Sequence, residues 1–390
     1  MRLALVSHKI CWKSAESPSG YATDGGFPSQ VEAISELFDE TRVLVPCLSS
    51  SVPKGLSPLT GNNLHIVPLD VPSGENLRRK LNMLPWAIKN SSVIWRETRK
   101  ADAIHAPIPG DVGTIGMLLA MLLRKPLFVR HCGNWMVQKT LAEDFWKWSM
   151  ERFAGGRNVM FATGGDSVSP SETNPNIKWI FSTSLRQHDL NDSVTRELPG
   201  DGAVRLITAC RLEEKKGVDG VIESMPLILE KFPKAFLDVV GDGSLLPKLR
   251  EQVRRLGIKD KVTFHGKVTP SKVVELMKAS HVFCFPTSAS EGFPKVVLEA
   301  MASGLPVITT KVSVLPELVG GSGCGILLDA PTAGNLADAV KTICSDPVAY
   351  RQISSNTIKT ASQYSLENWR DFIGENLRKA WNVESLSSAQ

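Results

Sequence analysis

Two glutamates, Glu291 and Glu299, lie on either side of a Gly-Phe-Pro turn in the segment SASEGFPKVVLEAMASG. An apolar run, HVFCF, precedes this segment and another, PVITT, follows it, which is typical of a loop and helix between two parallel strands. Pro294 suits the first turn of that helix, and Gly304 suits its left-handed end. We therefore expect Glu291 in the loop at the carboxyl end of a strand and Glu299 inside the helix.

These positions suggest a ligand site. In open α/β sheets ligands bind at the carboxyl ends of the strands, and the free N–H groups of a helix N-terminus suit a phosphate. Glu299, inside the helix, can accept hydrogen bonds from a ribose diol, and Glu291 can face the sugar end of the same ligand. The alternative is that both glutamates are ordinary solvated side chains, because an exposed glutamate is the norm.

The whole chain indicates an α/β protein of two domains. Its 390 residues exceed what one hydrophobic core organises well. Short β-branched runs such as LALVS, VRLITA and AFLDVVG alternate with longer amphipathic stretches, which is the pattern of two doubly wound, Rossmann-like domains. The Gly/Pro-rich segment ELPGDGA places the predicted boundary at 199/200, giving domains 1–199 and 200–365. Apolar residues at helical spacing in the tail predict a terminal helix over 366–385.

Composition excludes several classes of function. The net charge of +5 is spread along both halves, which argues against nucleic acid as the partner. Seven cysteines without a Cys-x-x-Cys motif are expected to be reduced thiols rather than disulfides or zinc ligands. The longest apolar run, GTIGMLLAMLL, is too short to cross a bilayer, and MRLALVSHKI is typical of a first strand rather than a signal peptide. We expect a cytoplasmic protein.

Several segments of the second domain follow one another in a familiar order. They are ACRLEEKKG, VVGDGSLLPKL, FHGKV, EGFP, EAMASGLPV and LPELVGGSGCGILL. This series resembles glycosyltransferase family 4, a group of retaining enzymes with the GT-B fold and an E-x7-E motif. The resemblance covers most of 204–328 and is much weaker over the first domain. It implies that the two Rossmann-like domains face each other across a cleft and that the C-terminal helix packs back on the first domain.

The resemblance also implies roles for a basic pair in the loop RLEEKKG. Arg211 and Lys216 would hold the diphosphate of a sugar donor, where fixed cations stabilise the charge that develops on the leaving group. Arginine offers a planar fork and lysine a compact charge, and both suit phosphate oxygens. The alternative is a charged surface loop with internal ion pairs, each worth at most about 1 kcal/mol.

The same resemblance assigns the two glutamates to one ligand. Glu299 would hold the ribose of the donor, and Glu291 the sugar, together with the turn Gly292, Phe293 and Pro294 and the backbone N–H groups near Phe293 and Pro294. Glu291 then positions the sugar and need not act as a nucleophile. The Gly241-Asp242-Gly243 segment is interpreted as a tight turn after a buried strand.

The first domain carries weaker candidates. Gly25 and Gly26 open a helix, where the backbone can approach a ligand, and relatives use such a loop near the donor diphosphate and the acceptor. His131 ends the strand PLFVR, where the family places a histidine against the donor sugar. A structural histidine and a flexible turn are the alternatives. Arg130 is a further candidate for an anionic acceptor.

The segment 76–100 mixes basic residues with leucine, methionine and tryptophan. It could lie on an anionic membrane surface and gather a lipid-linked acceptor. The alternative is a helix-loop-helix cap with a solvated basic face.

The predicted function is sugar transfer from a nucleoside diphosphate sugar, UDP- or GDP-linked, to the hydroxyl of a carbohydrate or lipid-linked acceptor in polysaccharide or glycolipid synthesis. No cofactor is expected, and no metal, because the chain has no Asp-x-Asp motif. Two rivals remain on the same scaffold. One is an epimerase or phosphorylase acting on sugar nucleotides, and the other is a catalytically silent partner protein.

Overall fold

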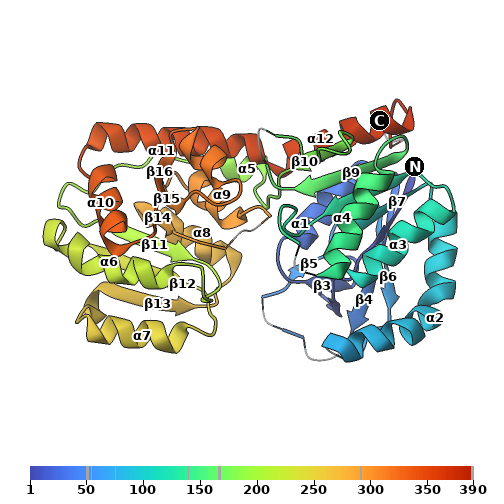
Figure 1. The fold of residues 1–390 in the computed structure, drawn as a ribbon, viewed down its shortest axis with the longest axis horizontal. Helices are drawn as coiled ribbons and strands as arrows, with labels where there is room; N and C mark the ends of the chain where they lie inside the picture. Colours follow the sequence, from blue (N-terminus) through green and yellow to red (C-terminus); the bar gives the residue numbers. More distant parts are fainter. Residues whose placement is uncertain are drawn as a thin grey trace. The chain divides into compact units, whose positions relative to one another are not determined.

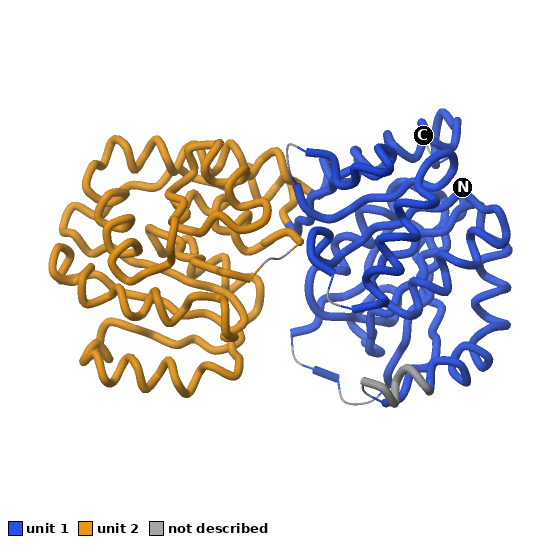
Figure 2. Tube along the Cα trace, in the orientation of Figure 1, with its two compact units in different colours: residues 1–184, 366–390 blue, residues 185–365 orange. Residues whose placement is uncertain are grey.

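The structure is a computed structural model that describes residues 1–49, 52–53, 55–74, 76–138, 140–165, 168–289 and 292–387, with side chains of 76–81 left out. The chain forms two compact units, shown in different colours in Figure 2. Unit 1 comprises Met1–Ser184 and Leu366–Gln390, and unit 2 comprises Leu185–Ser365. Each unit is a sheet covered by helices, as Figure 1 shows; the sheet of unit 2 is parallel throughout, and that of unit 1 is mainly parallel. The predicted α/β fold with two Rossmann-like domains is confirmed.

The boundary lies at 184/185, not at the predicted 199/200. Leu185 and Leu190 are buried in the core of unit 2. The Ser193 hydroxyl donates to the carbonyl of Ala302, at 2.6 Å. The segment 185–199 is therefore part of unit 2, because its apolar and polar contacts are both made there. The turn-forming composition of ELPGDGA marks a surface loop instead.

Unit 1 has a sheet in the order β10-β9-β8-β7-β1-β4-β2-β3-β5, with β6 paired to β4. The chain leaves β1 toward β4 and β6, then returns to β7 on its other side, which is a doubly wound topology. The strands are β1 (Arg2–Val6), β2 (Cys11–Lys13), β3 (Tyr21–Thr23), β4 (Glu40–Leu48), β5 (Ser57–Pro58), β6 (Leu64–Leu69), β7 (Ala103–Ile108), β8 (Leu127–His131), β9 (Asn158–Thr163) and β10 (Ile177–Ile180). The helices are α1 (Phe27–Ser35), α2 (Asn76–Lys100), α3 (Asp111–Leu122), α4 (Leu141–Phe153) and α12 (Leu366–Trp381).

Helix α2 is continuous from Asn76 to Lys100, although Pro85 lies inside it. The helix-loop-helix alternative for 76–100 is therefore wrong. Within the described residues, no helix is both long enough and apolar enough to cross a membrane.

The C-terminal helix α12 packs on unit 1. Its side chains Trp369, Ile373 and Leu377 are fully buried in a cluster that includes Leu3 and Phe128. Their spacing puts one apolar stripe of the helix against the sheet. The helix ends at Trp381, earlier than the predicted 385.

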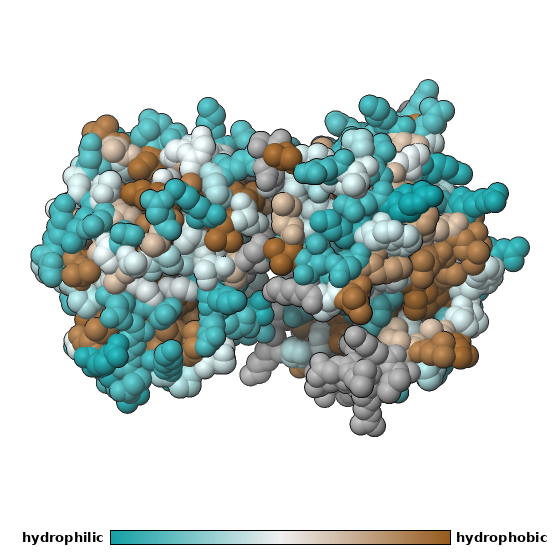
Figure 3. Space-filling model, viewed as in Figure 1, coloured by the Kyte–Doolittle hydropathy of each residue, from teal (hydrophilic) through white to brown (hydrophobic). Residues whose placement is uncertain are grey.

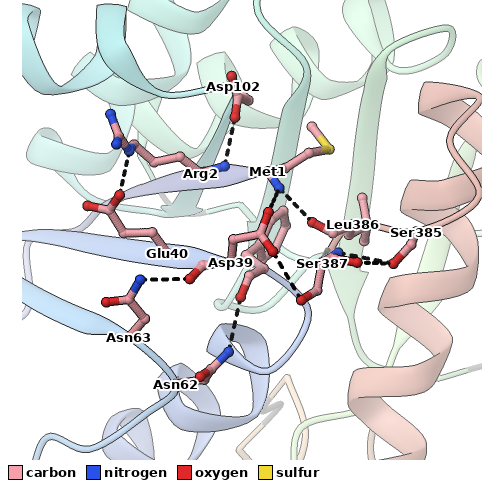
Figure 4. Close-up of polar contacts among 11 residues, drawn as sticks. Met1, Arg2, Asp39, Glu40, Asn62, Asn63, Asp102, Ser385, Leu386 and Ser387 are labelled. Atoms are coloured by element: carbon pink, nitrogen blue, oxygen red, sulfur yellow. Dashed lines mark hydrogen bonds and ion pairs between the residues drawn. The ribbon is translucent and has the colours of Figure 1, made fainter. Parts of the chain in front are cut away.

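Polar contacts fix the chain beyond α12 to the start of β1 (Figure 4). The N-terminal ammonium of Met1 donates to the carbonyl of Leu386, at 2.9 Å, and also bonds the carboxylate of Asp39. The Ser387 hydroxyl donates to the same carboxylate. Both ends of the chain thus contribute to one unit.

Unit 2 has a six-stranded parallel sheet in the order β13-β12-β11-β14-β15-β16. The strand order reverses between β11 and β14, and such a switch point is where ligands bind in open α/β sheets. The strands are β11 (Arg205–Ala209), β12 (Phe236–Val240), β13 (Val262–Gly266), β14 (Val282–Phe285), β15 (Val307–Thr310) and β16 (Gly325–Leu328). The helices are α5 (Gln187–Asn191), α6 (Val218–Lys231), α7 (Leu246–Arg255), α8 (Pro270–Lys278), α9 (Lys295–Ala302), α10 (Ala333–Ile343) and α11 (Pro347–Ala361), with short turns η1 (Lys259–Lys261), η2 (Pro316–Gly320) and η3 (Ser362–Tyr364).

Candidate functional site

A cavity of about 690 Å³ opens at the carboxyl ends of the strands of unit 2. It is lined by the loop after β11, the turn after β12, the segment after β13, the end of β14 and the start of α9. The cavity therefore occupies the switch point of the sheet. Among its lining residues are five predicted site residues: Arg211, Lys216, Phe293, Pro294 and Glu299.

The loop between β11 and α6 holds Lys216 in place. The backbone carbonyl of Lys215 accepts hydrogen bonds from the Ser288 N–H at 2.8 Å and the Thr287 hydroxyl at 3.0 Å. Gly217 follows with φ of +73°, and a Cβ there would come within 2.3 Å of the Pro286 carbonyl oxygen. The loops after β11 and β14 are therefore in close backbone contact, which only glycine permits at this position.

The ammonium of Lys216 is placed in an unusual environment for a lysine. Only 5% of the residue is exposed, and its Nζ lies 5.9 Å from the centre of the Phe285 ring. Burial lowers the pKa of Lys216 from its ordinary value, and nearby Arg211 lowers it further. A negatively charged ligand in the cavity would offset this cost, because it stabilises the charged form.

Arg211 lies at the open side of the same cavity. Its side chain is 73% exposed and forms an ion pair with Glu213, with 2.9 Å between Nη1 and Oε1. The internal ion pair considered as an alternative is thus present. An exposed pair of this kind contributes at most about 1 kcal/mol, so a ligand can displace Glu213 at small cost.

Glu299 is held by the helix that carries it. Val297, Leu298, Ala300 and Met301 are buried, which fixes the helix and directs the half-buried Glu299 to the cavity. The cavity lining also includes the residues at the N-terminus of α9, whose free N–H groups and positive dipole end favour an anion.

Pro294 is the N-cap of α9, not a residue of its first turn. Phe293 packs its ring against Tyr364, with centroids 5.8 Å apart. Gly292 precedes them and is half-buried. The predicted sugar ligand Glu291 lies outside the described residues.

Sequence reasoning missed several lining residues. Asp242 is predicted only as part of a tight turn. Its Oδ1 accepts a hydrogen bond from the Gly243 N–H at 2.8 Å, and the residue also lines the cavity. Lys267, which follows β13, and Lys295, at the start of α9, line it as well. The sequence signal that could identify these lining residues is their position just after a strand or at the start of a helix. Four cations and two carboxylates result among the described lining residues: Arg211, Lys216, Lys267 and Lys295 against Asp242 and Glu299.

His131 belongs to unit 1 and ends β8. It is buried, and its ring meets Trp135 edge to face with centroids 5.3 Å apart. Burial lowers the pKa of His131 to about 4, so the imidazole is neutral near pH 7. It can exchange hydrogen bonds with a neutral hydroxyl but does not supply a positive charge.

Arg130 is buried in unit 1. Its guanidinium donates to Gln30 Oε1 at 3.0 Å and lies 4.9 Å from the centre of the Trp369 ring. It therefore connects β8 with α1 and α12, and its role as a ligand of an anionic acceptor stays a prediction.

Gly25 and Gly26 lie in unit 1 just before α1. Gly25 is exposed with φ of +73°, and Gly26 is the N-cap of α1. Asp24 pairs with Lys9 in the same loop region. The structure thus brings five predicted residues together in unit 2, whereas Gly25, Gly26 and His131 belong to the other unit.

The family model of the Glycosyl transferases group 1 matches residues 196–360. The D-inositol 3-phosphate glycosyltransferase of Corynebacterium urealyticum is 31% identical over 165 residues, which are 40% of this chain and 39% of that protein. A GDP-mannose-dependent alpha-(1-6)-phosphatidylinositol monomannoside mannosyltransferase of Mycobacterium tuberculosis is 31% identical over 147 residues, 36% of this chain and 38% of that protein. The chain matches less than two thirds of the length of these curated relatives.

Solved structures of other proteins superpose on nearly the whole chain. Anabaena Alr3699/HepE in complex with UDP superposes with a TM-score of 0.70 at 18% identity, covering 97% of this chain and 100% of that one. Sucrose-phosphate synthase of Thermosynechococcus elongatus gives a TM-score of 0.69 at 17% identity, covering 98% and 99%. The chain has the GT-B fold of these proteins, and its unit 2 carries the similarity to group 1 glycosyl transferases.

Proposed function

We propose that the protein is a glycosyltransferase that moves a sugar from a nucleoside diphosphate sugar, UDP- or GDP-linked, to an acceptor hydroxyl with retention of configuration. The observation that carries the proposal is the cavity of unit 2, where Arg211, the buried Lys216, Glu299 and the N-terminus of α9 meet at the switch point of the sheet. The similarity of 196–360 to group 1 glycosyl transferases supports it.

The cations of the cavity act on the leaving group. Cleavage of the bond between sugar and diphosphate places new negative charge on the phosphate oxygens. Lys216 and Arg211, fixed beside the N-terminus of α9, stabilise that charge more strongly in the transition state than in the ground state. The four lining cations supply the compensation that a metal gives in other enzymes, so the proposal includes no metal and no cofactor.

The carboxylates orient the donor. Glu299 accepts hydrogen bonds from the ribose hydroxyls, and Glu291 with the backbone of Gly292, Phe293 and Pro294 holds the sugar. The leaving phosphate takes the proton of the acceptor hydroxyl, so no side chain is needed as a general base in this step.

Unit 1 binds the acceptor in this proposal. Gly25 and Gly26 present the N-terminus of α1 to the diphosphate and the acceptor, and the neutral imidazole of His131 hydrogen-bonds a hydroxyl of the donor sugar. The acceptor is a carbohydrate or a lipid-linked sugar of polysaccharide or glycolipid synthesis, used at the cytoplasmic face of a membrane that residues 76–100 contact. The mycobacterial relative is named as a phosphatidylinositol monomannoside mannosyltransferase, and this name supports a lipid-linked acceptor.

A thermal-shift screen of nucleoside diphosphate sugars tests the proposal. A donor present at a hundredfold excess over its Kd stabilises the folded state by about 2.7 kcal/mol, so one base should raise Tm clearly and the other bases much less. No shift with any UDP or GDP sugar, and no binding by calorimetry, would assign the chain to the silent partner proteins. Release of altered sugar nucleotide without any acceptor would favour the epimerase or phosphorylase.

The ion pair of Arg211 with Glu213 gives a prediction for donor affinity. Glu213→Gln is expected to tighten binding of the matched nucleoside diphosphate, because the guanidinium no longer has to leave a carboxylate. Since exposed pairs are weak, the gain should be at most about fivefold, and the free energy of unfolding should fall by less than about 1 kcal/mol. Calorimetry measures the affinity, and Glu214→Gln, an exposed neighbour, is the control. Equal affinities of the two variants would show that Arg211 does not reach the diphosphate.

A further inference from the structure

Unit 1 exposes an unusual number of large apolar side chains on the helices α2, α3 and α4. Figure 3 shows hydrophobic residues gathered over these helices. Within the described part of unit 2, the exposed large apolar residues are Val194 and Val348. Contiguous exposed apolar surface is rare on monomeric proteins and marks a site of interaction.

Helix α2 has apolar residues on two faces. Trp86 and Ile94 are buried in the core of unit 1. Leu84, Ile88 and Trp95 are exposed by 70%, 68% and 41%, and their spacing places them along a second face. A surface helix needs only one apolar face for its own core, so the second face is available for a partner.

Helix α3 repeats this arrangement beside α2. Val112 and Met117 are buried, while Leu118 and Leu122 are exposed by 49% and 70%. Between the two helices lies a cavity of about 460 Å³ whose lining includes Ile94, Trp95, Ile115 and Leu119. This cavity is thus a groove with mainly apolar walls, and the exposed Leu118 and Leu122 lie on one of the two helices that form it.

Helix α4 adds aromatic rings next to α3. The Trp146 Nε1–H donates to the Thr114 hydroxyl at 2.7 Å, which fixes the two helices side by side. Leu141, Phe145 and Trp148 are exposed by 89%, 40% and 56% at helical spacing. The three exposed stripes thus lie on neighbouring helices, and we call them together the α2–α3–α4 surface.

A basic edge borders this surface where α2 and α3 end. Lys125 Nζ donates to the carbonyl of Arg99 at 3.1 Å, so the two helix ends are adjacent. Arg99 and Arg124 are exposed, and Arg96 is exposed but forms an ion pair with the buried Glu97. Leucine and tryptophan beside such cations are the composition of surfaces that bind anionic membranes.

We propose that the α2–α3–α4 surface binds an anionic lipid bilayer, with its leucines and Trp148 at the acyl boundary and a lipid chain in the groove between α2 and α3. The basic edge faces the lipid headgroups. This extends the contact proposed for 76–100 to a defined surface of three helices. It does not depend on the donor cavity of unit 2, so donor binding serves as a separate readout.

Vesicle sedimentation tests this inference with the whole 390-residue chain. Wild type should sediment with vesicles of phosphatidylcholine and phosphatidylglycerol, and much less with phosphatidylcholine alone. The double variant Leu118→Ser/Leu122→Ser should partition at least about tenfold less, because two exposed leucines no longer leave water. The matched control Val194→Ser/Val348→Ser, in unit 2, should partition as wild type does.

A second pair of substitutions tests the electrostatic part. Arg99→Gln/Arg124→Gln should weaken binding and reduce its dependence on salt. An unchanged thermal shift with donor shows that each variant is folded. The inference is overturned if wild type ignores anionic vesicles, or if the leucine variant binds them as well as wild type. It is also overturned if ultracentrifugation finds a dimer that the leucine variant abolishes and no vesicle binding, which would assign the surface to a second copy of the chain.

Discussion

Lys216→Met is expected to reduce the rate of sugar transfer by about a hundred- to a thousandfold, the usual effect of removing one fixed donor to developing charge. The same substitution should change the free energy of unfolding by less than the roughly 2.7–4 kcal/mol that it removes from the transition state. Methionine matches the lysine side chain as far as its fourth atom, so it keeps most of the packing while it removes the buried ammonium, whose pKa burial lowers. Steady-state kinetics and urea denaturation measure the two effects.

The different sizes of these effects distinguish a binding residue from a structural one. Lys215→Met is the control, because Lys215 is the exposed neighbour and contributes its backbone carbonyl to the loop. It should retain both rate and stability. If Lys216→Met loses stability in proportion to rate, or if Lys215→Met is equally slow, the assignment of Lys216 to the diphosphate is wrong.

Glu299→Ala is expected to weaken the binding of the matched nucleoside diphosphate by about ten- to a hundredfold, because hydrogen bonds to a charged group contribute about 1.5–3 kcal/mol. Wild type should discriminate against the 2′-deoxy nucleotide, or the 3′-deoxy nucleotide, by a similar factor. The variant should bind the ribo and deoxy forms alike, since the carboxylate that senses the hydroxyls is gone.

A double-mutant cycle by calorimetry makes this test specific. The loss from Glu299→Ala and the loss from the deoxy ligand should not add, because both remove the same interaction. Glu251→Ala, on the exposed surface of α7, is the control and should change neither affinity. Full additivity would place the ribose away from Glu299.

The sequence predicts the elements around the cavity of unit 2 well. The apolar runs of β14 and β15 and the propensities of the helix between them locate Glu299 correctly, because these signals are local. The resemblance to glycosyltransferase family 4 implies that Arg211, Lys216 and Glu299 belong to one site. Their meeting in one cavity follows from the switch point between β11 and β14.

Other features depend on tertiary packing that no local pattern records. Asp242 and Lys267 reach the cavity because β12 and β13 extend the sheet on the same side of β11. The domain boundary moves to 184/185 because Leu185 and Leu190 are buried in unit 2. The apolar run of α3 is typical of a helix that is buried in the core. Only the packing shows that Leu118 and Leu122 remain exposed.

Hydrogen–deuterium exchange with and without the matched donor tests the central claim most directly, because it locates the bound nucleotide on the chain. The account predicts slower exchange in peptides that cover the β11–α6 loop, the turn at 241–243 and the start of α9, and no such protection in Glu299→Ala at the same donor concentration. Protection confined to unit 1, or protection of unit 2 that the variant retains in full, would contradict the account.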